Sequence, residues 1–118
     1  MKIAVCLSGQ LRGWEIGWNN QKWFWSTAYE NKAQVDYFAH TWSYSTDRSG
    51  VTQPYVTRDV KVEEFRKFAS LFATKKSLFD STPQKTFYSN DHWTGLFYSF
   101  VKSVLLKREY ERKHNFEY

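Results

Sequence analysis

The chain has 118 residues, of which 20% are aromatic and 42% are hydrophobic, and its formal net charge is +5. With five glycines and two prolines, this composition excludes collagen-like, low-complexity and disordered classes, and the lone Cys6 excludes a disulfide-stapled secreted miniprotein. No apolar run approaches the ~18 residues of a membrane span, and the opening apolar stretch is too short for a signal peptide. We therefore expect a cytoplasmic protein without a membrane segment.

The first half of the chain begins with a predicted strand and a predicted helix. Residues Ile3–Leu7 form an unbroken apolar run, typical of a strand buried on both faces, with Cys6 as a small buried residue inside it. From Trp14 to Tyr29, aromatic residues recur at helical spacing, which predicts a helix. We expect three further residues, Ile16, Trp23 and Phe24, to widen the apolar face of that helix.

A second strand is predicted at Val35–His40, ending at Thr41 and Trp42. Strand, helix and strand within so short a segment indicate a βαβ crossover with parallel strands. Ligands of open α/β sheets bind outside the carboxyl ends of the strands. The two segments that follow the strands, residues 8–12 and 40–42, are therefore expected to face one crevice.

The rest of the chain is predicted to hold two more helices. Residues 43–53 have the composition of an exposed loop, Asp59 is a plausible N-cap for a helix over 61–73, and residues 74–89 are expected to be irregular. A last helix is predicted over 93–113, capped by Asn90 or Asp91. Its expected core face comprises Phe97, Phe100, Val101, Val104 and Leu105.

Asn115, shortly after the predicted last helix, is a reasonable residue for the position that follows a helix. Phe116 and Tyr118 alternate with polar Glu117, a pattern that is typical of the start of another strand.

Two segments carry residues suited to chemistry. Ser8, Gly9, Gln10 and Arg12 follow a strand and offer a hydroxyl, close backbone approach and a guanidinium, so the segment either binds a phosphate or is an ordinary βα turn with a surface Arg. His40, Thr41 and Trp42 end the second strand, where His40 is expected to be structural or to touch a substrate. We predict no metal site, because no Asp-x-Asp pair or ligand cluster accompanies this histidine, and no cysteine or serine nucleophile.

The basic charge is dispersed over several elements and often lies beside acids. Interleaved aromatic and basic residues can bind single-stranded nucleic acid, but the chain has no strand motif of that kind. Nucleic-acid binding is thus the weakest of the alternatives.

The segment from Lys2 to Arg12, the aromatic helix after it, and Val35–Trp42 together resemble the N-terminal half of a group of viral, phage and bacterial glycosyltransferase-like proteins. These proteins have a GT-A-like, nucleotide-diphospho-sugar transferase fold, with a strand ending in Ser-Gly-x-x-Arg and a later strand ending in His-Thr-Trp. The last helix, with Tyr110, Glu111 and residues 115–118, adds to the resemblance, whereas residues 43–90 resemble the family poorly.

The resemblance implies binding of a nucleotide-diphospho-sugar donor by Ser8, Gly9, Gln10, Arg12, His40, Thr41 and Trp42. It implies an α/β fold with a parallel sheet and flanking helices, forming a Rossmann-like or GT-A-like half-domain. In the family, metal-dependent members place an Asp-x-Asp for Mn²⁺ or Mg²⁺ beyond the strand that would follow Tyr118. No cofactor is therefore expected within this chain, and its catalytic residues are not assigned.

We thus expect residues 1–118 to form a single α/β unit, the incomplete N-terminal portion of a larger domain. Aromatic residues such as Trp23, Trp25, Phe97 and Phe100 would then pack against a partner, which makes a homo-oligomer the expected assembly. The alternative to donor binding is a non-catalytic interaction module that oligomerises through its open sheet edge and aromatic surface.

Overall fold

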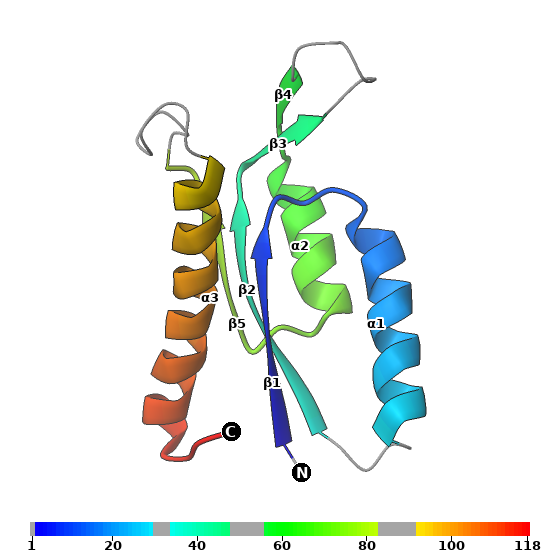
Figure 1. The fold of residues 1–118 in the computed structure, drawn as a ribbon, viewed down its shortest axis with the longest axis vertical. Helices are drawn as coiled ribbons and strands as arrows, with labels where there is room; N and C mark the ends of the chain where they lie inside the picture. Colours follow the sequence, from blue (N-terminus) through cyan, green and yellow to red (C-terminus); the bar gives the residue numbers. More distant parts are fainter. Residues whose placement is uncertain (1, 30–33, 48–55, 83–91) are drawn as a thin grey trace.

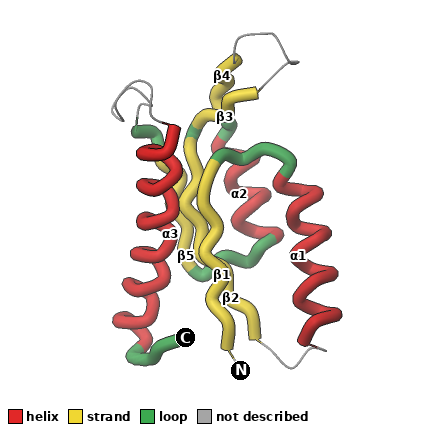
Figure 2. The backbone as a smooth tube through the Cα atoms, in the orientation of Figure 1, coloured by secondary structure: helices red, strands yellow, loops and turns green. Residues whose placement is uncertain are grey.

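The protein is a three-layer α/β unit in the computed structural model, which describes residues 2–29, 34–47, 56–82 and 92–118. Its elements follow one another in this order: β1 (Lys2–Gly9), α1 (Trp14–Tyr29), β2 (Gln34–Trp42), β3 (Tyr44–Asp47), β4 (Val56–Asp59), α2 (Val62–Leu71), β5 (Lys76–Asp80) and α3 (His92–His114). Helix α3 covers one face of the central sheet, and α1 and α2 cover the other (Figures 1 and 2).

The central sheet has three parallel strands in the order β1-β2-β5, which confirms the predicted α/β class and the βαβ start. Lys2 lies opposite Gln34 and Gly9 lies opposite Thr41, so β1 and β2 end at the same edge. Both strands have the expected positions, each extended by one or two residues at either end. Because β2 is the middle strand, its residues from Asp36 onward are buried.

Alternation along β2 sends successive side chains to opposite faces of the sheet. Tyr37 and Ala39 join the core against α1 and α2, where the Tyr37 ring meets those of Trp18 and Phe72. Phe38 instead packs against Tyr110 of α3. Trp14 and Trp18, four residues apart on α1, both pack against this cluster, in agreement with the helical spacing of the aromatic residues.

The expected exposed loop over 43–53 is wrong for its first part. Tyr44–Asp47 forms β3, which pairs antiparallel with β4, and Ser45 in it is fully buried. Residues 48–53 lie outside the described part. Asp59 does not cap α2, because it is held extended in the β3–β4 ladder opposite Tyr44, and the N-cap is Lys61, which makes no side-chain capping bond.

The expected irregular region over 74–89 is wrong for Lys76–Asp80, which forms β5 and pairs in parallel with the second half of β2. This strand is short and has two lysines at its start, so the sequence pattern does not predict it. The amide of Ser43 donates to the carbonyl of Asp80 at 2.8 Å, which ties the end of β5 to the start of the β3–β4 hairpin.

Part of the core face expected on α1 and most of that expected on α3 are wrong. On α1, Ile16, Trp23 and Phe24 are exposed, and Trp23 retains 67% of its accessible surface. On α3, Phe97, Phe100, Val101 and Leu105 are exposed, while Ser99 and Ser103 are fully buried beneath them. The small serines let the helix backbone lie close to the sheet. The side chains of Trp25 and of any cap at Asn90 or Asp91 lie outside the described residues.

The end of α3 agrees with the sequence. Asn115 has a φ of 55°, and the amide of Phe116 donates to the carbonyl of Glu111 at 3.2 Å, the two features of a left-handed helix cap. Residues 116–118 form no strand here but turn back onto the sheet. Among the described helices, none has the length and apolar character that crossing a bilayer requires.

Candidate functional site

The carboxyl edge of β1 and β2 holds the residues singled out from the sequence. The parallel register places Ser8 beside His40 and Gly9 beside Thr41, so the two segments are neighbours. Their side chains divide between the two faces of the sheet. Thr41 lies with the face that α1 and α2 cover, whereas His40 and Trp42 lie with α3.

A cavity of about 340 Å³ opens at this edge, on the α1 and α2 face. Most of its wall is apolar and comes from both helices and the end of β1. The residues that line it are Leu7, Ser8, Gly9, Gln10, Leu11, Trp14, Gly17, Asn20, Gln21, Thr41, Phe68 and Phe72. The cavity is thus an apolar hollow whose lining also includes three side-chain amides (Gln10, Asn20 and Gln21) and two hydroxyls (Ser8 and Thr41).

Thr41 is the one buried side chain among the described residues whose polar atom has no hydrogen-bond partner. It is 4% exposed, and it lines the cavity. A buried hydroxyl without a partner costs about 1–3 kcal/mol relative to a satisfied one. A ligand that reaches the floor of the cavity with a donor or acceptor would remove this cost.

The β1–α1 loop exposes its backbone at the mouth of the cavity. Gly9 has a φ of 123°, a backbone conformation that residues with a Cβ rarely adopt. No heavy atom other than those of the adjacent residues lies within 4 Å of where a Cβ would stand. Leu11 anchors the loop in the core, and the amide of Arg12 donates to the carbonyl of Gln10 at 3.0 Å. The Arg12 side chain is exposed, next to the cavity rather than among its lining residues.

His40 occupies a polar cluster on the opposite face. Its Nε2 lies 2.8 Å from Oδ2 of Asp80, and its Nδ1 lies 2.7 Å from Oγ of Ser99. Burial raises the pKa of Asp80, but hydrogen bonds from His40 and Thr82 outweigh it and lower that pKa to about 2. Because an ionised carboxylate only accepts, Nε2 carries the proton and the Ser99 hydroxyl donates to Nδ1.

Burial lowers the pKa of His40, and the neighbouring Asp80 only partly offsets this effect. The ring is therefore neutral at pH 7. Although serine, histidine and carboxylate stand in line, Ser99 lies in the first half of α3 and is fully buried. The cluster joins β2, β5 and α3 through the buried side chain of His40.

Trp42 closes this cluster from the edge of the sheet. Its ring stacks on Tyr98 at 5.6 Å and on Tyr44 at 5.5 Å, and it meets His40 edge-on at 4.9 Å. Trp42 therefore shields the histidine on the α3 face, on the other side of the sheet from the cavity that Thr41 lines.

Asp80 and Ser99 were missed by the sequence analysis. Asp80 belongs to the strand that the pattern concealed, and no spacing links it to His40. Ser99 and Ser103 lie four residues apart in the largely apolar first half of α3, and this spacing was the available signal for a polar buried face. In the described part of the chain, no three His, Cys, Asp or Glu side chains gather in a way that would hold a metal ion.

No protein-family model matches this chain, and neither a curated protein nor a solved structure is detectably similar to it. The cavity that Thr41 lines, with the loop from Ser8 to Leu11 in its wall and Arg12 next to it, is therefore the candidate functional site on structural grounds.

Proposed function

We propose that this chain binds a nucleotide-diphospho-sugar donor at the carboxyl edge of its parallel sheet, as a glycosyltransferase-like, GT-A-like half-domain. The observation that carries the proposal is the buried, unpartnered hydroxyl of Thr41 on the floor of an apolar cavity. The resemblance of the two strand ends to glycosyltransferase-like proteins supplies the ligand class.

The cavity wall suits the base of a nucleotide. Small-molecule sites are mostly apolar, with a few polar groups that fix orientation. Leu11, Trp14 and Phe68 offer flat or branched apolar surface, and the amide of Asn20 lies at the wall with Thr41. A planar base seated there would bury its faces against these side chains and satisfy the Thr41 hydroxyl with one of its ring or exocyclic atoms.

The loop at the mouth suits the diphosphate. Ser8, Gly9 and Gln10 line the rim with backbone and a hydroxyl, and the guanidinium of Arg12 stands outside it. A cation beside a diphosphate stabilises the charge that develops when the sugar bond breaks. Arg12 is thus the proposed cationic partner of the leaving group, and the proposal assigns no catalytic base in this chain.

Calorimetric titration with uridine and guanosine diphosphates, with and without Mn²⁺, tests the proposal. We expect one of the two to bind, and Thr41→Val to weaken it about tenfold, the effect of about 1.4 kcal/mol. Valine has nearly the same shape without the hydroxyl, so Thr41→Val should also raise the stability of the ligand-free protein by about 1 kcal/mol.

Arg12→Ala should weaken diphosphate binding, while Arg66→Ala on the exposed face of α2 should leave it unchanged. If neither nucleotide binds, or if Arg12→Ala and Thr41→Val both bind as the parent chain does, the donor proposal is wrong. A Thr41→Val variant that is stabilised but binds normally would assign the hydroxyl no part in recognition.

A further inference from the structure

The outward side of α3 carries an apolar stripe in its first half. Phe97, Val101 and Leu105 follow one another at four-residue spacing, and 63%, 51% and 42% of their surfaces are exposed, respectively. Phe100 widens the stripe. These apolar side chains do not pack on the sheet. The side of α3 that faces the sheet includes Ser99 and Ser103 instead, and both are fully buried. An apolar stripe turned away from the core is a common mark of an interface.

The same side of α3 becomes basic in its second half. Arg108 and Arg112 continue the stripe one and two turns beyond Leu105. The two glutamates of this segment are already engaged, since Glu109 pairs with Lys76 and Glu111 with Lys107. Among the described residues, no carboxylate forms an ion pair with Arg108 or Arg112.

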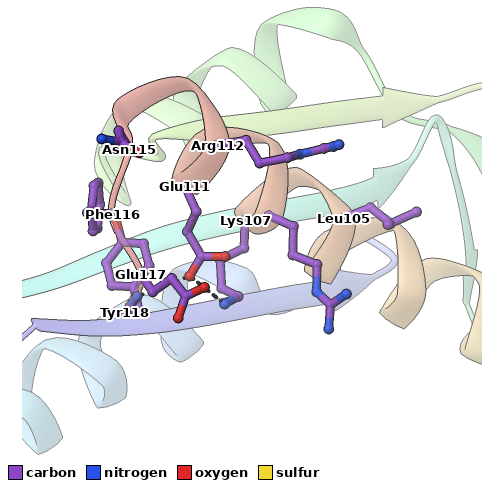
Figure 3. Close-up of a pocket in the computed structure, with 9 residues that line it drawn as sticks. Leu105, Lys107, Glu111, Arg112, Asn115, Phe116, Glu117 and Tyr118 are labelled. Atoms are coloured by element: carbon purple, nitrogen blue, oxygen red, sulfur yellow. Dashed lines mark hydrogen bonds and ion pairs between the residues drawn. The ribbon is translucent and has the colours of Figure 1, made fainter.

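A hollow of about 880 Å³ lies beside the basic half, between α3 and the C-terminal segment. Its wall includes Arg108, Arg112, Phe116 and Tyr118, with Leu105 at the end nearest the apolar half (Figure 3). Glu111 and Glu117 also line it, and Glu111 is occupied by Lys107 and by the amide of Tyr118. The hollow therefore offers rings and guanidinium groups.

We propose that two copies of this chain associate through α3, with the two helices antiparallel across a two-fold axis near Val104 and Leu105. This arrangement places Phe97 of each copy against Arg112 and the hollow of the other. It also places Val101 of each copy against the stem of the other copy's Arg108. A two-fold interface is self-complementary, so one aromatic half and one basic half on a single helix suffice for both contacts.

The chemistry of the two halves fits this pairing. Guanidinium groups bind the faces of aromatic rings, and arginine stems cover apolar surface. The opposite, parallel arrangement would set Arg108 and Arg112 against their own copies and leave them without a partner. A strongly acidic partner is the competing occupant, since each chain carries a net charge of +5.

The dependence of association on salt distinguishes a second copy of the chain from an acidic partner. Two copies with the same charge repel each other, so added sodium chloride should tighten the association of the chain with itself. Sedimentation velocity over a concentration series should show a monomer–dimer equilibrium that shifts to dimer as salt rises. Monomer at every concentration and salt would overturn the proposal, as would dimers that dissociate on adding salt.

Variants locate the interface. Phe97→Lys should weaken dimerisation at least about tenfold, because the contact of the ring with Arg112 of the other copy is lost and two positive charges meet in its place. Trp23→Lys changes an equally exposed ring on α1 and should leave the dimer unchanged. Circular dichroism of both variants shows whether each is folded. Equal effects of the two variants, or no effect of Phe97→Lys, would contradict the assignment.

Disulfide formation tests the antiparallel register. Residues 97 and 112 are separated by about 22 Å along one helix, so in the proposed dimer residue 97 is far from its own copy and close to residue 112 of the other. In a Cys6→Ala background, a mixture of Phe97→Cys and Arg112→Cys chains should form disulfide-linked dimers. Each variant alone should not, and a dimer linked through Phe97→Cys alone would refute the register.

Discussion

His40 Nε2 lies 2.8 Å from Oδ2 of Asp80 inside the α3 face of the sheet. This contact joins the middle strand to an edge strand, and the Ser99 hydroxyl at 2.7 Å from Nδ1 adds α3 to the same cluster. Each ring nitrogen has one partner, and the Asp80 carboxylate fixes the proton of the neutral ring on Nε2. Because burial lowers the pKa of His40, the stability of the fold should depend on pH.

We predict that the free energy of unfolding falls as the pH drops below about 6.5. Burial lowers the pKa of His40 in the folded state, so the unfolded chain takes up a proton first. A second decrease in the free energy of unfolding is expected as the pH falls from 3.8 to about 2, because Asp80 is protonated over this range in the unfolded chain but not in the folded one. For Asp80 this amounts to about 2 kcal/mol.

Urea denaturation at a series of pH values measures both losses. The other groups around the ring are Lys102, whose charge disfavours a protonated His40, and the phenols of Tyr44 and Tyr98. His40→Gln keeps a polar side chain but does not titrate, so the first loss should disappear in that variant. An unchanged slope below pH 6.5 in His40→Gln would assign the titration to another group.

Tyr118 anchors the end of the chain to the sheet. Its hydroxyl donates to Oδ2 of buried Asp36 at 2.6 Å, and its ring meets Phe38. Burial and the adjacent Asp36 raise the pKa of Tyr118, so it remains a donor at neutral pH. We predict that Tyr118→Phe lowers the free energy of unfolding by about 2 kcal/mol, the worth of a hydrogen bond to a charged group.

Tyr110→Phe is the matched control for this prediction. Tyr110 also packs on Phe38, but its hydroxyl makes no hydrogen bond with any described residue. Its removal should change the stability by less than about 0.5 kcal/mol. Thermal or urea denaturation compares the two, and equal losses would show that the Asp36 contact contributes no stability.

Ala73 ends α2 in a conformation suited to glycine. Its φ is 47°, its amide donates to the carbonyl of Ser70, and the amide of Thr74 donates to that of Ala69, the two bonds of a Schellman cap. A left-handed conformation costs a residue with a Cβ about 1–2 kcal/mol, partly offset by the lower chain entropy of unfolded alanine. We predict that Ala73→Gly stabilises the protein by about 0.5 kcal/mol.

Ala69→Gly, in the interior of the same helix, should act in the opposite direction and cost about 1 kcal/mol. Both changes are measured by urea denaturation. If Ala73→Gly is destabilising to the same extent as Ala69→Gly, the strain attributed to position 73 does not exist.

Local sequence patterns determined the start of the fold. The apolar run of β1, the aromatic spacing of α1 and the mostly apolar run of β2 are patterns among neighbouring residues, so each predicts its element without knowledge of distant contacts. The βαβ start follows from these three elements. The common edge of Ser8–Gly9 and Thr41 also follows, since parallel strands joined by a helix must end together.

Other features of the fold depend on contacts between segments that are far apart in the sequence, and local patterns do not predict them. Strand β5 is too short and polar to be recognised alone, and it exists because β2 offers it an edge to pair with. Asp80 contacts His40 because β5 pairs with β2, so a pattern that does not predict β5 cannot predict this contact. The faces of α3 depend on which side meets the sheet, and close packing favoured Ser99 and Ser103 over larger rings.

The sequence by itself thus determined the α/β class and the edge of the sheet at which the candidate site lies. Only the tertiary structure separated Thr41 from His40 and Trp42, because the two-residue period of a strand sends neighbours to opposite faces. It assigned Thr41 to a cavity and His40 to the core, and it left Trp23 of α1 and Phe97 of α3 exposed.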